Sequence, residues 1–158
     1  MNITLTIKWN ELQQQLDLRN YYMGEAAKRN NIEADTMQSS EDDKELFSMF
    51  ANQACNALIS AVAIRYPHTN YSIDDKKITF VFEASRDSHI QMLSMLQQAI
   101  LDYLVNEINM QWLLHRQPQM AQTNISLRGS LYQNVMQLFS RICNPQKLHR
   151  RATDLAGI

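Results

Sequence analysis

The sequence has few of the residues that interrupt regular structure. It contains three glycines and three prolines among 158 residues, which leaves few positions for tight turns. A sandwich or barrel of many short strands needs a turn every few residues, so this composition argues against one and favours long helices. The length fits a single domain that buries a core without disulfide or metal staples.

Cysteine and long apolar runs are also scarce. The two cysteines, Cys55 and Cys143, have no partner at metal-binding spacing and fall on apolar faces of expected helices, so we expect buried, reduced thiols. No apolar run approaches the roughly 20 residues of a membrane span, and the N-terminal segment MNITLTIKWN alternates rather than running apolar. We therefore expect no signal peptide and no transmembrane segment, and a protein that is intracellular where it is made.

A strong net charge is missing, but the charges are unevenly distributed. The formal net charge of -1 excludes a uniformly basic nucleic-acid binder. Residues 1–45 carry nine acids and five bases, whereas residues 116–158 carry one acid, Asp154, and six bases. An acidic front and a basic back suit head-to-tail contacts between identical subunits, which close into rings.

The longest uninterrupted pattern runs from about residue 88 to residue 116. Its apolar residues follow the spacing of one helical stripe, and no Gly or Pro breaks it: Leu93, Leu96, Ile100, Tyr103, Leu104, Ile108 and Leu114. At 1.5 Å per residue such a helix is about 40 Å long, the width of a small domain. We expect the other elements to pack along it as a central helix.

Three further helices are expected. One begins after a cap at Asn10 and turns these residues inward: Leu12, Leu16, Tyr22 and Ala26. After a loop over residues 30–40, the second begins at a capping box of Ser40 and Asp43 and ends near Tyr66, before Pro67. Its expected inward residues are Leu46, Phe47, Phe50, Ala54, Ala57, Leu58, Ala61 and Val62. The last follows a loop over residues 117–124 and turns these residues inward: Ile125, Leu131, Val135, Leu138, Phe139 and Ile142.

The remaining periodic segments read as strands. Ile3, Leu5, Ile7 and Trp9 alternate with polar residues, which predicts a half-buried strand. Residues 70–84 form a predicted hairpin around Asp74 and Asp75, with one apolar face made by Ile78, Phe80 and Phe82. This hairpin either joins the N-terminal strand or adds to a neighbouring subunit's sheet. The expected fold class is mainly α: a helical bundle around the helix at about 88–116, with a small β element.

Residues 1–144 are expected to form one mainly helical domain, and residues 145–158 an extended basic tail. The tail holds the main basic cluster: Lys147, His149, Arg150 and Arg151. This cluster could contact DNA phosphates without sequence preference or dock into an acidic patch on a partner, and a merely solvated tail is equally compatible with the sequence. A small helical DNA-binding or regulatory protein that uses this tail is therefore the alternative function.

The motifs that carry chemistry are missing. The four histidines, His68, His89, His115 and His149, fall in different elements without metal-binding spacing. Asp102 and Glu107 are five residues apart on one helix, so we expect solvated or interface charges rather than an acid/base pair. Two tryptophans, Trp9 and Trp112, are expected to anchor the core or an interface. We expect no catalytic residues, no metal, no cofactor and no enzyme activity.

One family shares the order of these elements. An acid-led helix, SEDDKELFSMFANQACNALISAVAIRYP, is followed by a second, HIQMLSMLQQAILDYLVNEINMQWL. Together they resemble the small helical head-tail connector (head completion) proteins of tailed phages and prophages, with AILDYLVNEI at Ala99 to Ile108 as the matching piece. The resemblance covers about residues 40–115, and the N-terminal strand, the hairpin and the long central helix depart from the compact members of that family.

The resemblance implies a structural role. Such proteins form a ring, commonly dodecameric, between the portal and the tail, and DNA passes through it. The implied partners are copies of the chain itself, portal and tail proteins, and DNA in nonspecific contact, with no membrane. The implied location is the virion, after synthesis in the bacterial host cytoplasm. The family has no catalytic residues to carry over.

Overall fold

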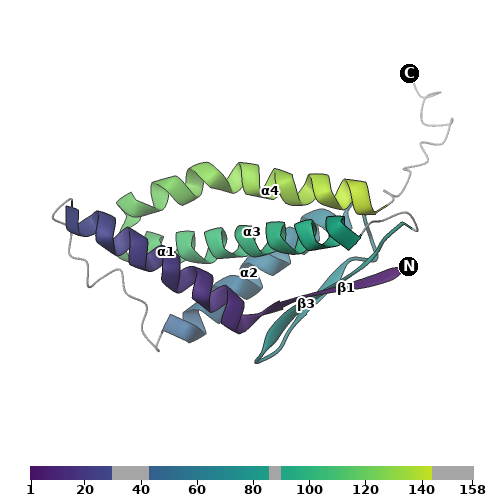
Figure 1. Cartoon of the computed structure of the whole chain (residues 1–158), viewed down its shortest axis with the longest axis horizontal. Helices are drawn as coiled ribbons and strands as arrows, with labels where there is room; N and C mark the ends of the chain where they lie inside the picture. Colours follow the sequence, from purple (N-terminus) through teal and green to yellow (C-terminus); the bar gives the residue numbers. More distant parts are fainter. Residues whose placement is uncertain (30–42, 86–89, 144–158) are drawn as a thin grey trace, which may run out of the picture.

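A computed structural model describes residues 1–29, 43–85 and 90–143 of the chain (Figure 1). Within them the chain forms four α-helices and a small three-stranded antiparallel sheet, which confirms the expected mainly α fold class. The elements in chain order are β1 (Asn2–Lys8), α1 (Trp9–Arg29), α2 (Asp43–Ala63), β2 (Asn70–Ile73), β3 (Lys77–Glu83), α3 (Ile90–Arg116), the 3-10 helix η2 (Pro118–Ala121) and α4 (Gln122–Ile142).

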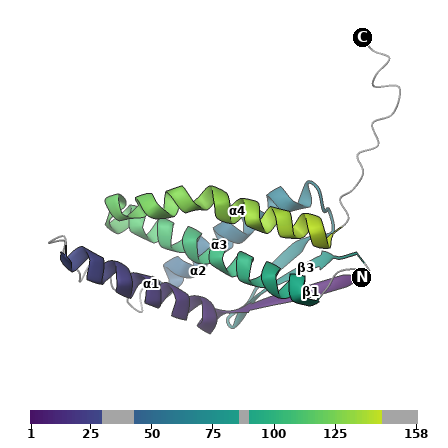
Figure 2. The ribbon, with the colours of Figure 1, turned by 45° about the horizontal axis from the view of Figure 1, so that its top comes forward.

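Helix α3 is the centre of the fold, as the sequence predicts. From Ala99 to Leu113 every residue except Asp102 and Gln111 is buried, which is typical of a helix surrounded on all sides. Figures 1 and 2 show α4 returning beside α3, with α1 and α2 on its other sides and the sheet at one end. Two residues of the predicted stripe lie at its margins, because Leu93 is half-buried and Leu114 is exposed.

The sheet joins the N-terminal strand to the hairpin, so the first of the two arrangements expected for the hairpin is confirmed. Strand β3 is central and pairs antiparallel with β1 and with β2. The predicted alternation holds on both long strands, since these residues are all buried on the inner face: Ile3, Leu5, Ile7, Ile78, Phe80 and Phe82. The hairpin turn is closed by the Asp74 carboxylate, which accepts hydrogen bonds from the backbone N–H groups of Lys76 and Lys77.

Strand β1 runs into α1 without a loop, and this changes the predicted start of the helix. Trp9 is the first helical residue rather than the last of the strand, so Asn10 lies in the first turn and is not the cap. The backbone N–H of Trp9 donates to the Lys76 carbonyl at 2.9 Å, and its indole Nε1 donates to the Asp74 carbonyl at 2.7 Å. These two bonds hold the start of α1 against the hairpin turn.

The predicted inward face of α1 is half wrong. Leu12 and Leu16 are buried as expected, but Tyr22 and Ala26 are exposed. Tyr22 lies six residues after Leu16, which places it about 120° around the helix from the buried stripe. The stripe continues instead through the buried Asn20 and the partly buried Met23.

The other two helices differ from prediction in detail. In α2, Leu46 and Ala57 are exposed and the helix ends at Ala63, before Tyr66, while the proposed capping residue Ser40 lies outside the described residues. Helix α4 begins inside the predicted loop, at Gln122. Its Ile125 is exposed and Leu131 is partly buried, whereas the remaining predicted residues are buried: Val135, Leu138, Phe139 and Ile142.

By length and composition, α2 could cross a membrane, and it is the one described helix that could. In this fold several of its apolar residues line the core, with Phe47, Cys55 and Leu58 all buried. Helices that pass through the centre of a folded domain commonly meet the same two criteria.

A cluster of polar and aromatic groups ties the start of α2 to the end of α3. Arg116 lies 2.8 Å from the buried carboxylate of Asp43. The same guanidinium stacks over the Trp112 ring at 4.9 Å from its centroid, and that ring packs edge-on against Phe47. Because Asp43 is almost fully buried, the charged group of Arg116 compensates for part of the cost of burying its carboxylate.

We predict that Arg116→Met lowers the free energy of unfolding by about 1.5–3 kcal/mol, because a buried carboxylate loses a charged hydrogen-bond partner. The matched control is Arg65→Met, at an exposed position just after α2, which we expect to change stability by less than about 0.5 kcal/mol. Urea titration of the three proteins measures the difference. Equal destabilisation by the two substitutions would contradict a specific role for the Arg116–Asp43 pair.

We predict that Gly129→Ala stabilises the protein by about 0.5–1 kcal/mol, because glycine in a helix interior costs backbone entropy. Gly129 lies within α4, and an added Cβ there meets no atom within 4 Å. The control Gln133→Ala, at an exposed site one turn later, should change stability by only a few tenths of a kcal/mol. A decrease in the thermal midpoint of Gly129→Ala would contradict the open environment of this site.

Candidate docking groove

The basic tail cannot be placed by the structure. Lys147, His149, Arg150 and Arg151 lie outside the described residues, as does His89. Their expected contact with DNA or with a partner therefore stays a prediction.

The two cysteines are buried and free, as expected. Burial raises the pKa of the Cys55 thiol to about 12 and that of the Cys143 thiol to about 11, so both stay protonated near neutral pH. Of the histidines, His115 stacks parallel to the Phe50 ring, with 5.9 Å between ring centroids. In the described part of the chain, no three His, Cys, Asp or Glu side chains gather closely enough to hold a metal ion.

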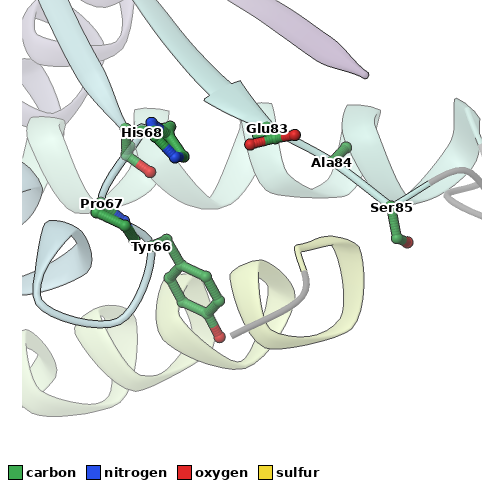
Figure 3. Close-up of a pocket in the computed structure, with 7 residues that line it drawn as sticks. Tyr66, Pro67, His68, Glu83, Ala84 and Ser85 are labelled. Atoms are coloured by element: carbon green, nitrogen blue, oxygen red, sulfur yellow. The ribbon is translucent and has the colours of Figure 1, made fainter. Parts of the chain in front are cut away.

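A polar pocket lies at the sheet end of the molecule (Figure 3). It is lined by the loop before β2 and by the end of β3: Tyr66, Pro67, His68, Thr69, Glu83, Ala84 and Ser85. Figure 3 shows Ser85 at the far end of the pocket with its hydroxyl pointing away from His68.

Glu107 is buried, which corrects the expectation of a solvated or interface charge. Its carboxylate Oε1 lies 2.7 Å from Nε of Arg128 on α4. Burial raises the pKa of Glu107, although Arg128 acts in the opposite direction through its charge and hydrogen bond. Asp102 does lie partly exposed and accepts a hydrogen bond from Gln98, so the two acids have different environments and separate partners.

Two asparagines beside this ion pair fix α3 against the start of α4. Asn106 Nδ2 donates to the Asn124 carbonyl at 3.0 Å, and Asn124 Nδ2 donates to the Asn106 carbonyl at 3.3 Å. Both side chains are buried. Buried amides that are paired in this way specify one alignment of two helices.

An apolar groove lies at the end of the helices opposite the sheet, where the second half of α1 faces η2 and the start of α4 (Figure 2). We call it the α1–α4 groove. Its lining residues are Arg19, Tyr22, Met23, Ala26, Asn109, Gln119, Met120, Thr123, Asn124 and Leu127. A concave, mainly apolar surface with a few polar groups is the usual form of a binding site.

The floor of the groove combines adaptable and polar side chains. Met23 and Met120 are partly buried, and methionine adjusts its shape readily to a partner. Asn109 Nδ2 donates to Met23 Sδ at 3.4 Å, while Asn109 Oδ1 has no hydrogen-bond partner. Within the described chain, this oxygen is therefore a buried acceptor that is not used.

An exposed apolar ridge runs along α1 beside the groove. We define the α1 ridge as Leu18, Tyr21 and Tyr22, whose exposed fractions are 50%, 64% and 63%. The spacing i, i+3, i+4 makes them neighbours on the helix surface, and the two tyrosine rings meet edge-on at 5.7 Å between centroids. Large apolar side chains clustered on a surface mark interaction sites.

Sequence reasoning missed both features. It placed Tyr22 in the core, although Tyr22 belongs to the ridge and lines the groove. Comparisons of the chain with known protein families, curated proteins and solved structures found no match. The resemblance of residues 40–115 to connector proteins stays a prediction.

We predict that Glu107→Gln removes part of the pH dependence of stability. Because the pKa of Glu107 in the folded protein lies above its ordinary value of 4.5, the folded state binds more protons than the unfolded state above pH 4.5. The parent protein therefore loses stability as pH rises through this window, and the variant does not. Urea titrations from pH 4 to pH 8 measure the free energy of unfolding of both proteins. The value for the variant should rise relative to that for the parent protein as pH increases.

The control for this prediction is Asp102→Asn, which changes a partly exposed carboxylate on the same helix. It removes one carboxylate from α3 and leaves the buried Glu107–Arg128 pair in place, so the difference between the two variants isolates the effect of Glu107. Parallel stability curves for the parent protein and Glu107→Gln would show that the burial of Glu107 does not perturb its ionisation.

Proposed function

We propose that this chain is a structural subunit that assembles with copies of itself into a closed ring, as the head-tail connector of a phage-like particle. The observation that carries the proposal is the α1 ridge beside the α1–α4 groove: one chain presents a convex and a concave apolar surface. Surfaces of this kind are enriched at protein–protein interfaces.

The two surfaces differ in shape, so the ridge of one copy can meet the groove of the next. Such a contact can repeat head-to-tail from copy to copy until it closes into a ring. The charge distribution fits the same arrangement, since residues 1–45 are acidic on balance and residues 116–158 are basic. In this proposal the ring contacts portal and tail proteins and surrounds the DNA.

A binding role also agrees with the chemistry of the described residues. In the polar pocket at the sheet end the Ser85 hydroxyl points away from His68, and both thiols are buried with raised pKa values. The titratable Glu107 is paired with Arg128 between two helices rather than facing an open cleft. These groups support the packing of the helices.

We predict that the purified protein forms one closed oligomer whose population grows with concentration. Light scattering on a sizing column, over a hundredfold range of concentration, should give a mass that is a fixed multiple of the chain mass. Negative-stain images of that fraction should show rings with a central opening. A mass of one chain at every concentration, alone and mixed with a portal protein, would rule out the connector proposal.

The same samples test the alternative function. A DNA-binding or regulatory protein would remain small and would bind DNA at low salt through its tail. The triple substitution of Lys147, Arg150 and Arg151 by Ala would then reduce the salt dependence of binding. For a ring held by apolar contacts, the triple variant should assemble like the parent protein.

A further inference from the structure

We infer that the α1 ridge of one copy lies in the α1–α4 groove of the next copy. This inference rests on the proposed function, because it names the surfaces through which copies of the chain assemble. The ridge and the groove lie on adjacent faces of the same helix, and Tyr22 borders both. Because α1 itself forms one side of the groove, its ridge cannot enter the groove of the same chain. The ridge can only enter the groove of another molecule.

The shapes of the two surfaces suit this contact. The ridge presents side chains at positions i, i+3 and i+4, which is the pattern by which an amphipathic helix occupies an apolar groove. The groove lies between α1 and the start of α4 and has apolar walls that include Met23, Met120 and Leu127. Docking would cover Leu127 and the tyrosines of the ridge, which are all exposed in the single chain.

The charges of the two surfaces are complementary. Glu11 is exposed on α1 and lies seven residues, or about two turns, before Leu18, so it extends the face of the ridge. Arg19 lines the groove, and no Asp or Glu is among its lining residues. The groove therefore favours a helix that carries carboxylates.

The test uses one substitution on each surface. Tyr21→Arg changes the ridge, and Leu127→Arg changes the groove; both sites are exposed on helices, so the single chain should keep its helical circular dichroism and unfolding midpoint. Each variant alone should fall to the mass of one chain. The control Ile64→Arg, at an 81% exposed position in the turn after α2, should assemble like the parent protein.

The decisive sample is an equal mixture of the two variants. The Leu127→Arg chain has an intact ridge and the Tyr21→Arg chain has an intact groove, so one contact can form between them. The two altered surfaces carry the same charge and repel each other, which prevents any further addition. The mixture should therefore give a mass of two chains and nothing larger.

Each other outcome overturns a defined statement. If both variants still assemble like the parent protein, the ridge and the groove are not the contact, although self-assembly stands. If each variant is a single chain but the mixture forms no dimer, the ridge of one copy does not lie in the groove of a second copy, and this inference is wrong. If the parent protein never assembles, the proposed function fails together with this inference.

Discussion

The fold depends on the burial of the second half of α3, from Ala99 to Leu113. A helix segment that is largely apolar is stable only when other elements remove its faces from water, and here α1, α2, α4 and the sheet do so together. The polar groups within this core are held by partners from neighbouring helices, such as Arg128 for Glu107 and Asn124 for Asn106. Because every layer meets α3, the chain folds around one core rather than several.

The outer helices contribute unequally, and this explains where the binding surfaces lie. Helix α4 packs along the length of α3, whereas α1 contacts α3 through a narrower stripe of Leu12, Leu16, Asn20 and Met23. The opposite side of α1 remains exposed with Leu18 and the two tyrosines. The same narrow contact leaves the groove between α1 and the start of α4.

The period of apolar residues was enough to predict the elements that face the core. Alternation predicted the inner face of the sheet, and the stripe from Leu96 to Ile108 predicted the central helix. The spacing of apolar residues gave a wrong prediction of burial at two kinds of position. Tyr22 and Ile125 are apolar but exposed, and Glu107 and Asn20 are polar but buried. The groove itself was not predictable, because it is formed by residues from α1, α3, η2 and α4 that only the tertiary structure brings together.

The direct passage from β1 into α1 has a mechanical consequence. No flexible loop separates the two elements, and Trp9 fastens their junction to the hairpin turn through its backbone and its indole. The first residue of α1 is therefore held to the sheet by two hydrogen bonds as well as by the chain, and the α1 ridge lies further along the same helix. A partner bound at the ridge would contact a helix whose start is fixed to the sheet.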